Sequence, residues 1–124
     1  MIRRDEVVSL TKSGVTSEQL LFPENSHSTR VTVTRVTVSP GATQPRHAHP
    51  QSEQIWVALR GTARLLLEGS AAEPFGEGDI VRFIEGDVHG VENSGAESFV
   101  YLSVTSPPIN FRSAYAADAT GSRR

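Results

Sequence analysis

The chain has 124 residues with a formal net charge of −2, and hydrophobic residues make up 37% of it. This length suits one domain, whose core must be built mainly from Val, Leu and Ile because aromatic residues are only 6%. Lys and Arg are spread along the chain, which argues against nucleic-acid and membrane-surface partners. The chain contains no cysteine, so disulfides, thiolate nucleophiles and Cys-ligated zinc are excluded. Its apolar runs stop short of the ~18 residues of a membrane span and no signal-peptide pattern is present, so we expect a cytoplasmic protein.

Short strand-like segments follow one another along the chain, with Gly, Pro, Asn and Ser between them. Residues 30–38 alternate β-branched apolar side chains with polar ones, a pattern that predicts a half-buried strand. Strands that recur about every ten residues with turn signals between them are typical of an all-β sandwich or barrel. We expect an N-terminal arm at 1–29, a barrel at 30–106 and a C-terminal extension at 107–124 that is partly disordered. The other predicted strands of the barrel are 54–60, 62–68, 80–84, 88–92 and 99–105.

Three of the four histidines carry the strongest chemical signal in the sequence. His47 and His49 stand two positions apart, so on a strand their imidazoles point to the same face. A distant imidazole from His89, together with one oxygen ligand, would complete the protein ligands of a single metal ion. The fourth histidine, His27, lies in a polar loop, and we interpret it as a surface residue. Because an isolated His-x-His is more often part of a polar loop than of a metal site, the interpretation depends on the surrounding residues.

Two blocks of regularly spaced residues contain these histidines. The first block consists of Gly41, His47, His49, Gln54 and Gly61, separated by five, one, four and six residues. The second block consists of Gly78, Ile84, Gly86, His89 and Asn93, separated by five, one, two and three residues. In this order the two blocks resemble the paired motifs of small, single-domain members of the cupin superfamily, and the resemblance covers about residues 30–105.

The resemblance implies a double-stranded β-helix, a jelly-roll barrel whose two sheets close over a central cavity. His47 and His49 would reach into this cavity from one strand, and His89 from the opposite part of the barrel. The glycines would allow tight turns between strands, and Asn93 would stabilise a turn by bonding to backbone groups. Three imidazoles and an oxygen suit Fe, Mn, Ni, Cu or Zn, so the implied cofactor is a divalent transition metal whose identity stays open.

The sequence departs from the family pattern at the fourth metal ligand, which is usually Glu. The four-residue interval after His49 and the six-residue interval before Gly61 both place the fourth ligand at Gln54. Glu53 is one residue away from that position and would point to the other face of the strand. We favour Gln54 and keep Glu53 as the alternative. A neutral ligand set would leave the metal charge uncompensated and would favour anionic or enolate-type ligands. A second departure, Ile84 in place of the usual proline, lies in a turn and leaves the histidines unaffected.

Two aromatic residues are candidates for the pocket wall and for catalysis. Trp56 stands two positions beyond Gln54 and shares its face, so it belongs either to the pocket or to the core. Tyr101 shares a face with Phe99 and Ser103, and its phenol would be useful beside a metal-bound oxygen. Arg46 is interpreted as a solvated surface residue, with the cavity mouth as the alternative.

The resemblance leaves the reaction open, because this fold supports many chemistries. The first hypothesis is a metal-dependent enzyme that acts on a small organic molecule, with dioxygenase-like chemistry foremost. The second is a non-catalytic ligand-binding or sensor protein. The third is a metal-assisted isomerase or lyase, which needs a general base, and Glu53 and Tyr101 are the candidates for it.

The resemblance also implies a homodimer. The strand predicted at 30–38 would present a long edge that needs cover. The N-terminal segments Val7–Leu10 and Glu18–Phe22 are candidates for exchange across such a dimer.

Overall fold

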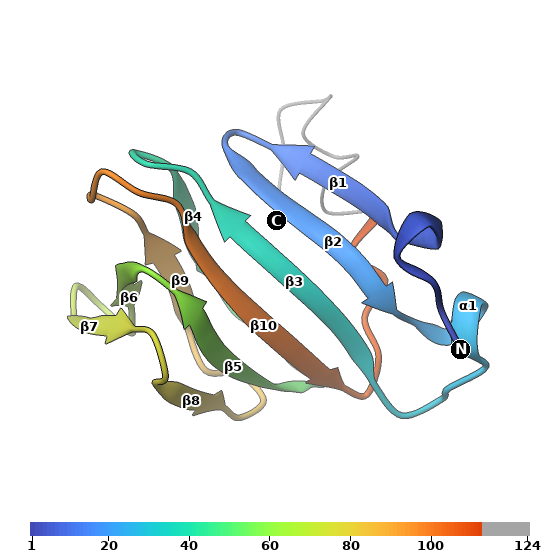
Figure 1. The fold of residues 1–124 in the computed structure, drawn as a ribbon. Helices are drawn as coiled ribbons and strands as arrows, with labels where there is room; N and C mark the ends of the chain where they lie inside the picture. The colour runs from blue at the N-terminus through green and yellow to red at the C-terminus, as the bar shows by residue number, and fades with distance from the viewer. Residues whose placement is uncertain (113–124) are drawn as a thin grey trace.

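The computed structural model describes residues 1–112 and confirms the predicted all-β fold. The strands form two antiparallel sheets, called here sheet A and sheet B (Figure 1). The hydrophobic core contains side chains from both sheets. Sheet A has the order β1-β2-β3-β10-β5-β8 and comprises β1 (Val8–Lys12), β2 (Val15–Leu21), β3 (Thr32–Val38), β5 (Glu53–Arg60), β8 (Ile80–Phe83) and β10 (Phe99–Ser106). Sheet B has the order β4-β9-β6-β7 and comprises β4 (Thr43–His47), β6 (Thr62–Leu66), β7 (Ala72–Gly76) and β9 (His89–Glu92). Two short helices, η1 (Arg4–Glu6) and α1 (Pro23–Ser26), lie outside the sheets.

The N-terminal arm adds two strands to sheet A. β1 and β2 form a hairpin, and β2 pairs with β3 of the same chain along most of its length. The prediction that residues 30–38 present an exposed edge is therefore wrong, because β3 lies between β2 and β10. Within the single chain the arm covers its own sheet, and its exchange across a dimer stays a prediction.

The C-terminal extension predicted at 107–124 is described as far as Arg112. The disorder expected for its remainder lies outside the described residues. Within residues 1–112, no helix has the length and the apolar character that crossing a membrane requires.

The inward side chains of sheet A change from apolar to polar along the strands. At one end of the sheet the paired inward residues are Val15, Val38 and Phe99. Further along, the paired inward residues are Gln19, Thr34, Ser103 and Trp56. At the far end they are Thr32, Thr105 and Gln54. The apolar half packs against sheet B as the core, and the polar half surrounds a cavity.

Two residues of the sequence blocks, Asn93 and Gly61, stabilise turns between strands. The Asn93 side chain donates to the carbonyl oxygens of Val38 at 2.9 Å and Glu97 at 2.8 Å, and accepts from the Gly95 amide at 3.0 Å. This confirms the prediction that Asn93 stabilises a turn. Gly61 has a φ of +81°, and a Cβ there would lie 2.8 Å from the Ser98 carbonyl oxygen, so the β5–β6 turn requires glycine.

Candidate metal centre

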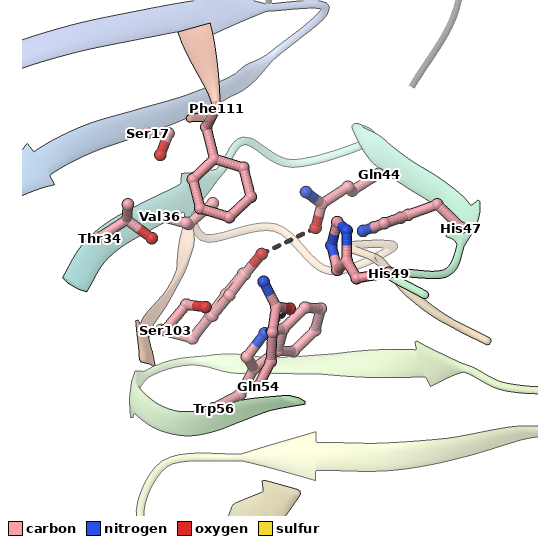
Figure 2. A pocket seen from close by; sticks show the side chains of 11 residues that line it. Ser17, Thr34, Val36, Gln44, His47, His49, Gln54, Trp56, Ser103 and Phe111 are labelled. Atoms are coloured by element: carbon pink, nitrogen blue, oxygen red, sulfur yellow. Dashed lines mark hydrogen bonds between the residues drawn. The ribbon is translucent and has the colours of Figure 1, made fainter. Parts of the chain in front are cut away.

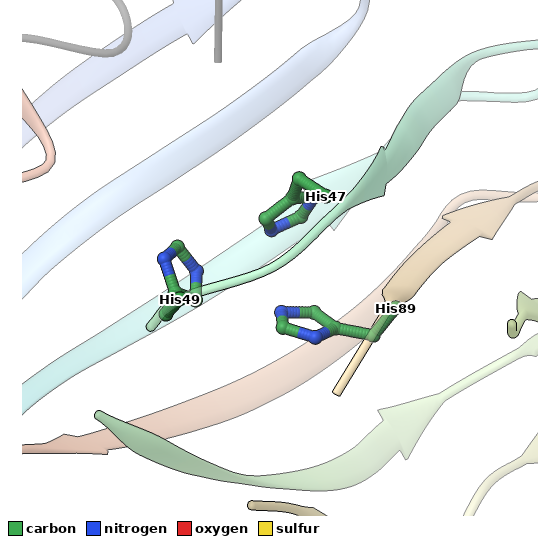
Figure 3. A group of neighbouring side chains, drawn as sticks. All are labelled: His47, His49 and His89. Carbon is green, nitrogen blue, oxygen red and sulfur yellow. The ribbon is translucent and has the colours of Figure 1, made fainter. Parts of the chain in front are cut away.

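Three histidines from two distant segments of the chain converge (Figure 3), and two of them, His47 and His49, line the cavity. His47 ends β4, His49 lies in the loop after it, and His89 begins β9. His47 and His89 are cross-strand partners in sheet B, so the expectation that His89 reaches in from the opposite part of the barrel is wrong. Their ligand-capable nitrogen atoms all lie within 4.8 Å of one another, close enough for one metal ion. The same-face placement of His47 and His49 depends on the loop rather than on strand alternation, because β4 ends at His47.

Backbone carbonyls orient two of the imidazoles. The Nδ1 atom of His47 lies 2.8 Å from the Pro45 carbonyl oxygen, and Nδ1 of His89 lies 2.9 Å from that of Asp87. A carbonyl can only accept, so Nδ1 carries the proton in each ring and Nε2 presents its lone pair. A backbone carbonyl in this role is a common outer partner of a metal-ligating histidine.

His89 is the most deeply buried of the three histidines, with 2% of its surface exposed. Burial, followed by the neighbouring imidazole of His47, lowers its pKa to about 3, so the ring is neutral at physiological pH. The ring stacks on Phe83 at a centroid distance of 4.5 Å. Its Nε2 atom is buried without a hydrogen-bond partner among the described residues, an arrangement that costs free energy unless another group binds there. A divalent transition metal fits this requirement, since neutral imidazole is a preferred ligand.

Gly90 permits the close approach of β4 to β9 that brings His47 beside His89. A Cβ at Gly90 would lie 2.6 Å from the carbonyl oxygen of Gln44 and 2.9 Å from the backbone nitrogen of Arg46. These are backbone atoms of β4, so no side-chain rotation relieves the contact. The sequence offered only one signal for this role, a glycine directly after a candidate ligand.

The two candidates for the fourth ligand lie on opposite faces of β5. Gln54 is buried and lines the cavity, with its amide oxygen accepting from the Trp56 indole at 3.0 Å and its amide nitrogen donating to Thr105 at 2.9 Å. Glu53 lies on the outer face, where it accepts from Arg82 at 2.8 Å. The strand-parity argument therefore holds, and the structure places Glu53 away from the histidines. Because a carbonyl oxygen has two lone pairs, the Gln54 oxygen can accept from Trp56 and still face a metal.

We expect Gln54→Ala to lower the affinity for a divalent metal about tenfold, the range seen when a supporting contact of a metal site is removed. Glu53→Ala is the matched control on the same strand, and we expect it to change the affinity less than about twofold. Competition with a chelator measures both affinities. Equal losses in the two variants would contradict the assignment.

The cavity beside the histidines is small, about 50 Å³, and its described lining contains no Lys, Arg, Asp or Glu (Figure 2). Trp56 and Tyr101 stack at a centroid distance of 4.2 Å, and the Tyr101 hydroxyl donates to the Gln44 side-chain oxygen at 2.7 Å. Trp56 is both a core residue, 1% exposed, and part of the cavity wall. The lining residues are Ser17, Thr34, Val36, Gln44, His47, His49, Gln54, Trp56, Tyr101, Ser103 and Phe111.

The sequence pointed to five residues that line the cavity, and it did not single out the remaining lining residues; the five are His47, His49, Gln54, Trp56 and Tyr101. Gln44 and Phe111 gave no signal, because each belongs to a segment whose packing depends on distant strands. Arg46 is exposed and donates to the Leu67 and Ala71 carbonyls, which confirms the surface interpretation. His27 is exposed at the end of α1, as expected.

Comparison with known proteins agrees with this architecture. A family model described as a cupin domain matches residues 34–105, and a search of the curated proteins finds no significant match. A predicted oxalate decarboxylase from Thermotoga maritima is similar at 23% identity, with a TM-score of 0.75 over 86% of this chain and 98% of that one. The polyketide cyclase RemF from Streptomyces resistomycificus is similar at 22% identity, with a TM-score of 0.75 over 86% and 78%.

A third similar structure, a conserved protein from Klebsiella pneumoniae, has a double-stranded β-helix domain. It is 26% identical, with a TM-score of 0.72 over 86% of this chain and 89% of that one. These similarities agree with the two-sheet barrel described above, and the family model spans more than half of the sequence. The chain therefore belongs to the cupin family.

Proposed function

We propose that this cupin is a metal-dependent enzyme that acts on a small organic molecule, with oxidation by dioxygen as the favoured reaction type. One observation carries the proposal: three imidazoles converge beside a cavity whose described lining contains no Lys, Arg, Asp or Glu, and the buried Nε2 of His89 has no hydrogen-bond partner among residues 1–112. His47, His49 and His89 would hold the metal, with Gln54 as the fourth candidate. A redox-active divalent ion bound there would supply Lewis acidity and the electrons for reaction with dioxygen.

The lining favours oxidation over isomerase or lyase chemistry, because those reactions need a general base near the metal. Glu53, one of the two candidate bases, lies on the outer face of β5 in an ion pair with Arg82. Tyr101 is the other candidate, and its hydroxyl donates to Gln44. No carboxylate lines the described part of the cavity. The similar proteins are named as a decarboxylase and as a cyclase, so their likeness supports a small-molecule enzyme without selecting one reaction.

The test combines metal analysis with oxygen consumption. Protein loaded anaerobically with Fe(II) should consume dioxygen in the presence of a small enolic compound, and His49→Ala should abolish this consumption. Protein loaded with Zn(II) is the control and should consume none. Metal binding without turnover, or identical behaviour of the Fe(II) and Zn(II) forms, would favour the alternative of a ligand-binding or sensor protein.

We also propose that the chain forms a homodimer through the outer face of sheet A. On this face Leu102 and Val104 of β10 pair with Val57 and Ile55 of β5, and all four side chains are only partly buried. The Glu18–Arg35 and Glu53–Arg82 ion pairs flank this apolar band. An apolar centre with a polar rim is the usual composition of a protein interface.

We expect the native protein to have twice the mass of one chain by light scattering after size exclusion. Leu102→Glu, which places a charge in the centre of the band, should convert it to a monomer. Ser70→Glu, at an exposed position between β6 and β7 of sheet B, is the control and should leave the dimer intact. A wild-type monomer would contradict the proposal.

A further inference from the structure

Two hydroxyl groups face each other on the inner surface of sheet A. Thr34 of β3 and Ser103 of β10 are direct cross-strand partners, and each is only 3% exposed. Both line the cavity, and Figure 2 shows them on the opposite side from His47 and His49. Within the described residues, no hydrogen bond occupies either hydroxyl.

Packing alone does not explain hydroxyls at these positions. The next inward residues of β3 are Val36 and Val38, and valine has the same shape as threonine without the cost of burying a polar group. Other buried polar groups nearby have internal partners: Thr105 accepts from Gln54, and Ser17 accepts from Gln19. Thr34 and Ser103 are therefore available to bind a molecule in the cavity.

The size and charge of the cavity limit what this molecule can be. A volume of about 50 Å³ corresponds to roughly four water-sized groups, so a chain of a few carbon atoms fits. A divalent ion held by neutral ligands attracts an anionic oxygen at the histidine end. The opposite end presents hydroxyls and no cation among the described residues, which suits an uncharged hydroxyl or carbonyl oxygen.

We propose that Thr34 and Ser103 form a subsite for the distal oxygen of a short hydroxy- or oxo-carboxylate, whose carboxylate lies at the histidines. The proposal rests on the metal-dependent function above and specifies its substrate class. Trp56 is the cross-strand neighbour of Ser103, and its ring lies 5.5 Å from that of His89. As the single tryptophan of the chain, it is an intrinsic fluorescent probe for both ends of the cavity.

The experiment uses the full chain loaded with Co(II) and three matched ligand pairs. These pairs are propionate and 3-hydroxypropionate, butyrate and 4-hydroxybutyrate, and valerate and 5-hydroxyvalerate. Trp56 fluorescence and the visible Co(II) spectrum report binding without any turnover. We expect the hydroxy acid of one length to bind about tenfold tighter than its parent, and the Thr34→Val/Ser103→Ala double variant to lose this preference. Thr37→Val, on the outer face of the same strand, should retain it.

The outcomes separate this subsite from the proposed function. A wild-type protein that binds cobalt and carboxylates without preferring any hydroxy acid would overturn the subsite alone. A preference that survives in the double variant would overturn it as well. A protein that binds no cobalt would overturn the metal-dependent function and the subsite with it.

Discussion

Replacement of His89 by alanine is expected to lower the affinity for divalent metal ions at least about a hundredfold. The imidazole is one of three whose ligand-capable nitrogen atoms lie within 4.8 Å of one another. Its Nδ1 is held by the Asp87 carbonyl, so Nε2 is the atom that would bind the metal, and alanine removes it. At a metal concentration one hundred times the wild-type dissociation constant, binding should stabilise the wild-type protein by about 2.7 kcal/mol. The same concentration should stabilise the variant by only about 0.4 kcal/mol, because it then equals the variant's dissociation constant.

Thermal unfolding with and without metal measures this difference. For a chain of this size the wild-type shift corresponds to about 10 °C. His27→Ala is the matched control, because His27 is exposed and lies outside the cavity. His49→Ala is a second variant that removes a half-buried ring, so the result does not depend on the fold tolerating loss of the buried His89 side chain. An undiminished metal-dependent shift in both variants would contradict the metal centre.

The main strands of the barrel could be predicted because their two faces differ in polarity. β3 and β10 alternate buried and partly buried positions along their whole length, and the sequence predicted both. β4 and β7 were missed, since Pro45 and Pro74 interrupt their patterns. Both are edge strands of sheet B, where a proline is tolerated, although the register of β4 with β9 shifts between Gln44 and His47, the stretch that contains Pro45. Position within a sheet cannot be inferred from a strand's own pattern, and the same limitation made β3 resemble an edge.

The sequence predicted the candidate metal ligands, but it did not predict the backbone groups and strand pairings that position them. Spacing identified the three histidines, and strand parity separated Gln54 from Glu53. The carbonyls that orient His47 and His89 belong to residues two positions before each histidine, and backbone geometry rather than residue type places them there. The hydroxyl pair of Thr34 and Ser103 exists only through the pairing of β3 with β10, which joins segments far apart in the sequence.

Replacement of Gly90 by alanine is expected to damage the site without removing any ligand. Its Cβ would lie 2.6 Å from the Gln44 carbonyl oxygen, so β4 must move away from β9 to accept it. Overpacking of this kind costs about 1–3 kcal/mol of stability. The displacement separates His47 from its cross-strand partner His89, and we expect the affinity for metal to fall about tenfold to a hundredfold.

Gly95→Ala is the matched control for this prediction. Its added Cβ would lie 3.4 Å from the Asn93 side-chain oxygen, an ordinary contact at an exposed position, so stability should change by less than about 0.5 kcal/mol. Chemical denaturation of the metal-free proteins measures the stability, and chelator competition measures the affinity. If Gly90→Ala lost stability but kept wild-type affinity, β4 would be able to shift without moving His47. The geometry of the metal centre would then depend on the loop that carries His49 rather than on the pairing of β4 with β9.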